Sequence, residues 1–108
     1  YSDDAIINGT LDGIVTSWNP AAERMYGYSG EEIIGKPIAL LLPEDRTDEI
    51  SSILVRIKTG EPVEHHGTMR VRKDGTVVPV SLTVSPIRDP DGTIIGASTI
   101  ACEVAEQK

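Results

Sequence analysis

The sequence predicts an α+β domain in which an antiparallel sheet carries its helices on one side. Three observations predict this class. A strand-like segment with a turn opens the chain, a segment with helical periodicity occupies the middle, and alternating segments separated by turns fill the second half. The length of 108 residues provides one domain, in which folding removes about two-thirds of the unfolded chain's surface from water.

The N-terminal segment predicts two strands connected by a turn. Residues 5–7 are a short apolar run that Asn8-Gly9 ends, and Asp12-Gly13 is a turn signal. Residues 14–18 then combine Ile, Val, Thr and Trp, which favour strands. The two runs therefore predict a pair of strands joined as a hairpin.

Capping signals predict two short helices after these strands. Asn19 followed by Pro20 is a helix start, because Asn accepts from the first amides and Pro fits the first helical position. Gly27 ends this helix. Ser29 and Glu32 have the spacing of a capping box, in which each side chain accepts a hydrogen bond from the other residue's backbone N–H.

The longest helix is predicted to begin at residues 43–45. Pro is followed there by two acids, which favour the positive end of the helix dipole. Ile50, Ile53, Leu54 and Ile57 follow the i, i+3, i+4, i+7 pattern. One stripe of this helix therefore packs inward.

The second half of the chain changes from helical to strand periodicity. Residues 63–73 form one long candidate strand, and Asp74-Gly75 is a strong hairpin signal. A second turn at residues 89–92 precedes the last strand, at residues 93–104. The strand between these turns alternates apolar and polar side chains, and its apolar face consists of Val78, Val80, Leu82 and Val84.

The charge balance and the cysteine count exclude several classes of partner. Seventeen acidic against ten basic residues give a net charge of -7, and the basic residues form no stripe, so we expect no nucleic-acid partner. A single cysteine, Cys102, excludes an internal disulfide. The longest apolar run, residues 38–42, is far shorter than a membrane span, and the acidic N-terminus is unlike a signal peptide. We expect a cytoplasmic domain, without membrane contact, cut from a longer protein.

Four motifs in a fixed order carry a resemblance to a known family. Residues 18–28 read WNPAAERMYGY, residues 72–76 read RKDGT, residues 84–89 read VSPIRD and residues 91–96 read DGTIIG. Together they resemble a PAS domain over nearly the whole chain. The resemblance implies a five-stranded antiparallel sheet of order 2-1-5-4-3, with short helices and one longer helix over one face. It implies a single PAS domain over residues 1–108, in which residues 103–108 begin a signalling linker.

The resemblance implies a sensory and dimerisation module of a larger signal-transduction protein, for which we expect a sensor histidine kinase. A diguanylate cyclase or a transcription regulator is the alternative parent, and a ligand-free structural dimerisation module is the alternative role. The expected partners are a second copy of the chain, flanking helices and an effector domain. Signal output would leave through Glu103, Val104 and Ala105, where relatives often carry Asp-Ile-Thr, and Ala105 lacks the hydroxyl of that Thr.

A small apolar pocket under the helices is the candidate binding site. Small residues of the last strand leave room there, and larger apolar residues form the walls. The candidate lining is Ile53, Ile57, His66, Val80, Leu82, Val84, Ala97 and Thr99. Met25, Leu40 and Leu41 could equally fill this space, so the sequence leaves open whether a ligand enters.

The directions of two adjacent histidines also stay open. Neighbouring residues of a strand point to opposite faces, so only one of them can line a pocket. The resemblance places His66 toward the cavity, whereas the alternation of Val63, Met69 and Val71 predicts His65. Adjacent histidines without Cys, Asp or Glu at matched spacing make a poor metal site, and we expect no metal.

Known cofactor sites of the family can be tested by position. Relatives that bind haem carry a His early in the long helix, and the corresponding residues 45–50 contain no His. Relatives that form a flavin mononucleotide adduct carry a Cys after the second short helix, and the corresponding residues 35–39 contain no Cys. Relatives that bind flavin adenine dinucleotide often carry a Trp where Val63 stands. The sequence thus argues against haem, excludes the flavin adduct, disfavours flavin adenine dinucleotide and leaves a small organic ligand open. It also lacks a base-activated nucleophile, so we expect no catalysis by this domain.

The outer face of the sheet is the candidate interface. If Val15 faces the helices, strict alternation places Ile14 and Trp18 on the outer face, and the resemblance adds Ile100. An exposed apolar patch of this kind usually marks a surface for a partner or a flanking helix. Ordinary burial at the edge of the sheet is the alternative.

Overall fold

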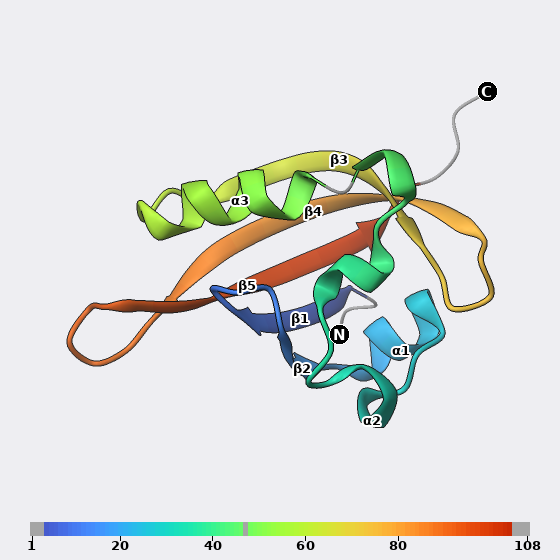
Figure 1. Cartoon of the computed structure of the whole chain (residues 1–108), viewed down its shortest axis with the longest axis horizontal. Helices are drawn as coiled ribbons and strands as arrows, with labels where there is room; N and C mark the ends of the chain where they lie inside the picture. Colours follow the sequence, from blue (N-terminus) through green and yellow to red (C-terminus); the bar gives the residue numbers. More distant parts are fainter. Residues whose placement is uncertain (1–3, 47, 105–108) are drawn as a thin grey trace.

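The centre of the molecule is a five-stranded antiparallel sheet with the order β2-β1-β5-β4-β3 (Figure 1). The computed structural model describes residues 4–46 and 48–104. The α+β class and the sheet order expected from the sequence are confirmed. The strands are β1 (Ala5–Thr10), β2 (Val15–Trp18), β3 (Val63–Val71), β4 (Val77–Arg88) and β5 (Ile94–Glu103).

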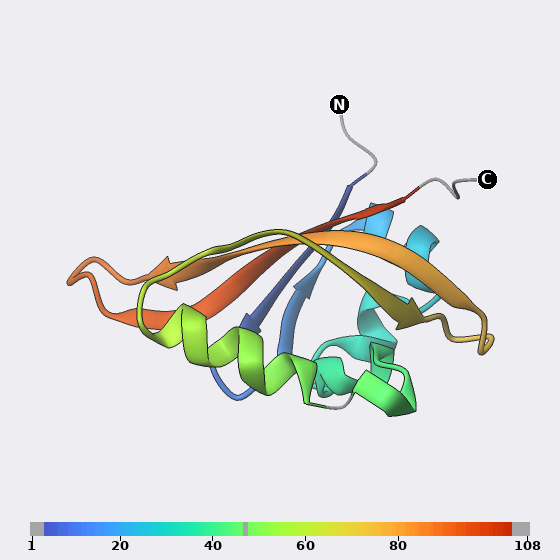
Figure 2. The same ribbon diagram turned by 90° about the horizontal axis from the view of Figure 1, so that it is seen from above.

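All helical segments of the described residues come between β2 and β3 in the chain. Figure 2 shows α3 and the short helical turns before it along one face of the sheet, which we call the inner face. The opposite face is the outer face. The helical segments are α1 (Pro20–Tyr26), α2 (Gly30–Ile33), the 3₁₀ turns η1 (Ile38–Leu41) and η2 (Glu44–Arg46), and α3 (Glu49–Lys58).

The capping residues expected from the sequence begin both short helices. Asn19 Oδ1 accepts a hydrogen bond from Ala22 N at 2.9 Å at the start of α1. The same oxygen accepts from Ile6 N at 2.9 Å, so Asn19 also attaches the helix to β1. Ser29 and Glu32 form the predicted capping box of α2.

The longest helix begins later than the sequence predicts. In η2, Arg46 N donates to Pro43 O at 3.0 Å, with the i to i+3 spacing of a 3₁₀ turn. This turn is separate from the hydrogen-bond ladder of α3, which begins at Glu49. The predicted start at residues 43–45 is therefore wrong. The inward stripe is present, with Ile53 and Ile57 buried.

The register between β1 and β2 shifts within the ladder. Ile7 pairs with Trp18, but Gly9 pairs with Val15, so β2 carries an extra residue at this point. Val15 and Trp18 are consequently both buried in the core. The Asn8-Gly9 pair lies inside β1, so the prediction that it ends the first strand is wrong.

A second register shift, in β3, decides the directions of the adjacent histidines. Val63 pairs with Val84 and His66 pairs with Leu82, which leaves one extra residue on β3. His65 has φ of 50°, in the left-handed region, and is exposed. The bulge keeps Val63 buried and turns His66 to the inner side of the sheet, where it contacts Glu49 of α3. Of the two directions that the sequence left open, strict alternation would have turned His65 inward, and the bulge turns it outward instead.

The core lies between the inner face and the helices. Its largest fully buried side chains are Tyr26, Ile33, Leu41, Ile57, Val15, Val78 and Val80. The ring of Trp18 packs on Tyr26 with centroids 5.6 Å apart, and Trp18 Nε1 donates to Tyr28 O at 2.9 Å. Within the described ranges no helix has the length and apolar character needed to cross a bilayer.

Candidate functional site

A cavity of about 60 Å³ lies between the inner face and the helices. Three predicted pocket residues do not line it: Ile57 and Val80 pack in the core, and His66 contacts Glu49 of α3. Leu41, which could have filled this space, is one of its walls. The predicted pocket residues that do line the cavity are Ile53, Leu82, Val84, Ala97 and Thr99. Their role in binding a ligand stays a prediction.

Four polar residues that the sequence did not place at the pocket also line the cavity. They are Asn8 and Thr10 of β1, Tyr26 of α1 and Arg70 of β3. Arg70 has the same parity as His66 and Thr68 along β3, so extending that alternation was the available signal. No comparable signal pointed to Tyr26, because its direction depends on how α1 packs on the sheet.

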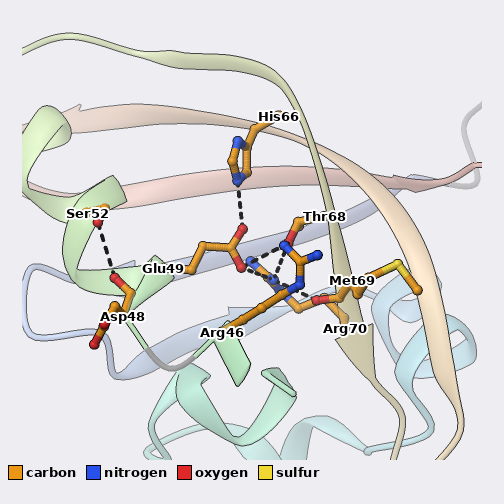
Figure 3. Close-up of polar contacts among 8 residues, drawn as sticks. All are labelled: Arg46, Asp48, Glu49, Ser52, His66, Thr68, Met69 and Arg70. Carbon is orange, nitrogen blue, oxygen red and sulfur yellow. Dashed lines mark hydrogen bonds and ion pairs between the residues drawn. The ribbon is translucent and has the colours of Figure 1, made fainter. Parts of the chain in front are cut away.

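A polar cluster around the carboxylate of Glu49 joins α3 to β3 (Figure 3). Glu49 Oε1 accepts hydrogen bonds from Arg70 Nη1 at 2.7 Å and from Thr68 Oγ1 at 3.0 Å. Glu49 Oε2 lies 2.7 Å from His66 Nε2. Arg46 Nη1 donates to Thr68 Oγ1 at 3.3 Å. We call these five residues the Glu49 cluster.

The Glu49 cluster keeps its carboxylate ionised. Burial acts to raise the pKa of Glu49, but the hydrogen bonds from Thr68 and Arg70 and the charge of Arg70 lower the pKa below its ordinary value. The guanidinium of Arg70 is itself buried, so its charge requires a partner at this place. An ion pair therefore fixes the first turn of α3 to β3.

Tyr26 supplies a neutral phenol to the cavity wall. Burial raises the pKa of Tyr26 to about 12, and the positive charge of Arg70 acts against that rise. The hydroxyl is consequently protonated at neutral pH and can donate one hydrogen bond and accept others.

β5 extends from the cavity to the end of the described chain. Ala97 and Thr99 line the cavity, and the strand ends at Glu103. Because β5 is hydrogen-bonded to β1 and β4 along its length and the interior is closely packed, a displacement at the cavity can be transmitted along the strand to that end.

The predicted output residues lie at this end of β5. Glu103 Oε1 pairs with Arg72 Nη2 at 3.1 Å, and Arg72 Nε donates to Met25 O at 2.9 Å. Val104 is exposed at its side chain. Ala105 lies outside the described residues. The role of these residues in output stays a prediction.

The predicted interface residues do not form one exposed patch. Trp18 belongs to the core, and Ile14 lines the cavity beside an isolated bridge to Pro37. The expectation that both lie on the outer face is wrong, because the register shift breaks the alternation for Trp18 and because Ile14 precedes β2. Ile100 is 44% exposed and pairs with Ile6, which is 40% exposed.

The metal-ligating side chains of the described residues form no cluster that could hold an ion. No group of three or more His, Cys, Asp and Glu that could hold a metal ion occurs in residues 4–46 and 48–104. Cys102 is a free thiol on the surface.

The sheet order, the helices over one face and the cavity beneath them define the PAS class of fold. The family comparison agrees, since the model of the PAS fold matches residues 2–101. The chain belongs to the PAS family, and the resemblance drawn from its motifs is confirmed.

Its curated relatives include a signal transduction kinase, a sensor protein and a phytochrome. The signal transduction histidine-protein kinase AtoS of Escherichia coli is 30% identical, over 98% of this chain and 18% of the kinase. The sensor protein FixL of Bradyrhizobium diazoefficiens is 32% identical, over 79% of this chain and 18% of FixL. Phytochrome C of Arabidopsis thaliana is 29% identical, over 89% of this chain and 9% of the phytochrome. The chain thus spans less than a fifth of the length of these relatives.

Solved structures share the fold. The PAS domain of a protein from Colwellia psychrerythraea has a TM-score of 0.88 and 28% identity, covering 96% of this chain and 88% of that chain. A light-oxygen-voltage domain studied with a flavin analogue has a TM-score of 0.78 and 20% identity, covering 95% of this chain and 78% of that chain. The relatives together support a sensory signalling module.

Proposed function

We propose that this PAS domain is the sensory input module of a larger cytoplasmic protein of the histidine-kinase class, and that the domain itself is not catalytic. The course of β5 carries the proposal. Ala97 and Thr99 of this strand line the cavity, and the same strand ends at Glu103, from which the chain continues. The similarity to sensor kinases supports the class of the parent protein.

The proposed mechanism is a shift between two packings of α3 against the sheet. Ile53 of α3 is one wall of the cavity, and Glu49 attaches the first turn of this helix to β3. A ligand that fits one packing better than the other shifts the population toward it by its difference in affinity. The altered packing then reaches the effector through β5.

The size of the cavity supports a small ligand rather than a large cofactor. Its volume of about 60 Å³ is well below the roughly 300–1,000 Å³ of sites for drug-sized ligands. Residues 35–39 and 45–50 contain neither the Cys nor the His that the family resemblance associates with flavin adducts and haem. We therefore propose that the domain senses without haem or flavin.

A cavity-filling substitution in the full-length parent protein tests the relay. Ala97→Leu places three more carbons in the cavity, and we expect it to change the rate of autophosphorylation from ATP several-fold. Ser98→Ala on the same strand is the matched control and should leave that rate unchanged. A parent protein without autophosphorylation refutes the kinase assignment, and equal rates for wild type and Ala97→Leu refute the relay.

Self-association through the outer face is a second proposal, favoured by the pairing of Ile6 with Ile100. Both side chains are exposed although they lie on neighbouring central strands, where an apolar pair gains by being covered. We expect the domain to sediment as a dimer and Ile100→Glu to make it monomeric. Ile95→Glu, at an exposed position of the same strand, should leave the dimer intact. A wild-type domain that stays monomeric at high concentration refutes this proposal.

A further inference from the structure

A buried guanidinium and a buried phenol line the same cavity with donors that no described residue uses. Arg70 is 3% exposed and Tyr26 is 1% exposed. All hydrogen bonds of the Arg70 side chain leave from Nη1, toward Glu49 Oε1, Thr68 Oγ1 and Met69 O. In the described part of the chain, Nε and Nη2 of Arg70 and the hydroxyl of Tyr26 have no hydrogen-bond partner.

The unused donors of Arg70 have the geometry that recognises a carboxylate. Nε and Nη2 form one edge of the planar guanidinium, and a carboxylate can accept two parallel hydrogen bonds from such an edge. The phenol of Tyr26 can donate a further bond to one of the same oxygens. The fully buried side-chain atom that the described residues leave without a partner is an acceptor, Asn8 Oδ1. The donors of Arg70 and Tyr26 therefore stay accessible to water, and a carboxylate binds them by displacing that water.

The local charges permit a singly charged anion. Arg46 adds a second guanidinium at the hydroxyl of Thr68 (Figure 3). Arg46 is exposed, as are the neighbouring acids Asp45 and Asp48, and water and salt screen all three charges. The buried pair of Arg70 and Glu49 is neutral, so one further negative charge at the free edge of Arg70 costs less than two.

The rest of the lining determines the size and character of the ligand. The walls around the polar end include Ile7, Leu41, Ile53 and Leu82, which are apolar and buried. The volume of about 60 Å³ is small, since each water-sized group needs at least roughly 10–15 Å³ of cavity. About four to six heavy atoms therefore fit. Those that contact the isoleucine and leucine walls are best apolar, while Asn8 Oδ1 of the same cavity has no partner among the described residues.

We propose that the cavity binds a monocarboxylate of about two to four carbons, with its carboxylate on Arg70 and Tyr26 and its alkyl part against the apolar walls. This inference rests on the proposed sensory function and names the ligand class of that site. Arg70 is the residue that determines specificity for the anion, and Tyr26 is the residue that orients it. The alternative occupant is water.

A titration of the isotope-labelled domain, followed by NMR, tests the ligand class. Sodium propionate at constant ionic strength should produce saturable shifts at the amides of Leu82, Ala97 and Thr99, with a millimolar dissociation constant because so few atoms bind. Propionamide, which has the same shape without the charge, should bind at least about tenfold more weakly. Acetate and butyrate should also bind, and octanoate should not. Absence of saturable propionate shifts, or equal binding of propionamide, overturns the proposal.

Two substitutions identify the groups that hold the carboxylate. Tyr26→Phe removes only a hydroxyl that has no described partner, so we expect unchanged or higher stability and about tenfold weaker propionate binding. Tyr28→Phe, outside the cavity lining, is the control and should bind propionate as the wild type does. Arg70→Lys keeps the charge but loses the guanidinium edge, and should bind at least about tenfold more weakly while the NMR spectrum remains folded. Wild-type affinity in both Tyr26→Phe and Arg70→Lys overturns the proposal.

The proposed ligand class and the proposed relay through β5 can fail independently of each other. If propionate binds the domain but does not alter the activity of the full-length protein, the ligand class stands and the relay is refuted. If Ala97→Leu alters the activity while propionate does not bind, the relay stands and the ligand class is refuted.

Discussion

The two ends of the inner face are held together by different forces. Near α1, Trp18 packs on Tyr26 and makes one hydrogen bond to the backbone. Near the start of α3, the contact with β3 depends on the ion pair of Glu49 with Arg70. The cavity lies between these regions and takes a phenol from one and a guanidinium from the other. Apolar packing responds little to pH and salt, so the α3 region is the end at which a charged ligand or a proton can change the packing.

Removing the carboxylate of the Glu49 cluster should give the largest effect. Glu49→Ala leaves the charge of Arg70 buried without a partner, and we expect the free energy of unfolding to fall by about 3–5 kcal/mol in urea denaturation. The double variant Glu49→Ala with Arg70→Met should recover most of this loss, because an apolar side chain needs no counter-charge. A loss below about 1 kcal/mol in the single variant would show that the pair does not hold α3 in place.

The aromatic end should be less sensitive to a single conservative change. Trp18→Phe removes the hydrogen bond to Tyr28 O and part of the ring volume, and we expect a loss of about 1–2 kcal/mol by the same measurement. The loss should be equal at pH 7 and at acidic pH, since no titrating group is involved. A loss that depends on pH would contradict the division between the two regions.

Acidification should weaken the α3 end selectively. The pKa of Glu49 is lower in the folded protein than its ordinary value of 4.5, so the stabilisation by its charge is complete above pH 4.5. It is lost as the pH falls from 4.5 through the folded-state pKa, because the unfolded chain binds the proton first. The difference in unfolding free energy between wild type and Glu49→Gln should therefore shrink over this range. A constant difference would remove Glu49 as the pH-dependent group.

The ion pair at the end of β5 should contribute least to stability. Glu103 and Arg72 are both partly exposed, and such pairs contribute about 0–1 kcal/mol. We expect Glu103→Gln to change the unfolding free energy by less than about 1 kcal/mol. Asp91→Asn is the control, because it changes the net charge of the chain by the same amount, and it should have an equally small effect. If Glu103→Gln also changes the activity of the full-length protein while Asp91→Asn does not, the pair acts on output rather than on folding.

Much of the fold could be predicted because it depends on neighbouring residues. Asn19 caps α1 as expected, since an N-cap needs only the amides of the next turn. The capping box of Ser29 and Glu32 and the buried stripe of Ile53 and Ile57 have the same local basis. The family motifs supplied the order of the strands, which periodicity does not contain.

Two of the uncertainties in the candidate site come from bulges. Strict alternation placed Trp18 outside and left His65 and His66 unresolved, but an extra residue in β2 and another in β3 reverse the parity. A bulge is decided by how two distant strands pair, so neither strand carries it in its own pattern. The start of α3 was misplaced for a different reason, because residues 44–46 form a separate 3₁₀ turn before the helix.

The sequence by itself determined the class of fold, the family, most of the strands and helices, and five of the residues around the cavity. These follow from local hydrogen bonding, from periodicity and from motifs. Only the tertiary structure decided that Glu49, His66, Thr68 and Arg70 form one cluster and that Arg70 and Tyr26 line the same cavity. The physical reason is that a buried charge pairs with whichever opposite charge lies close to it in space. That distance depends on the register of β3 and the position of α3, which the sequence pattern does not contain.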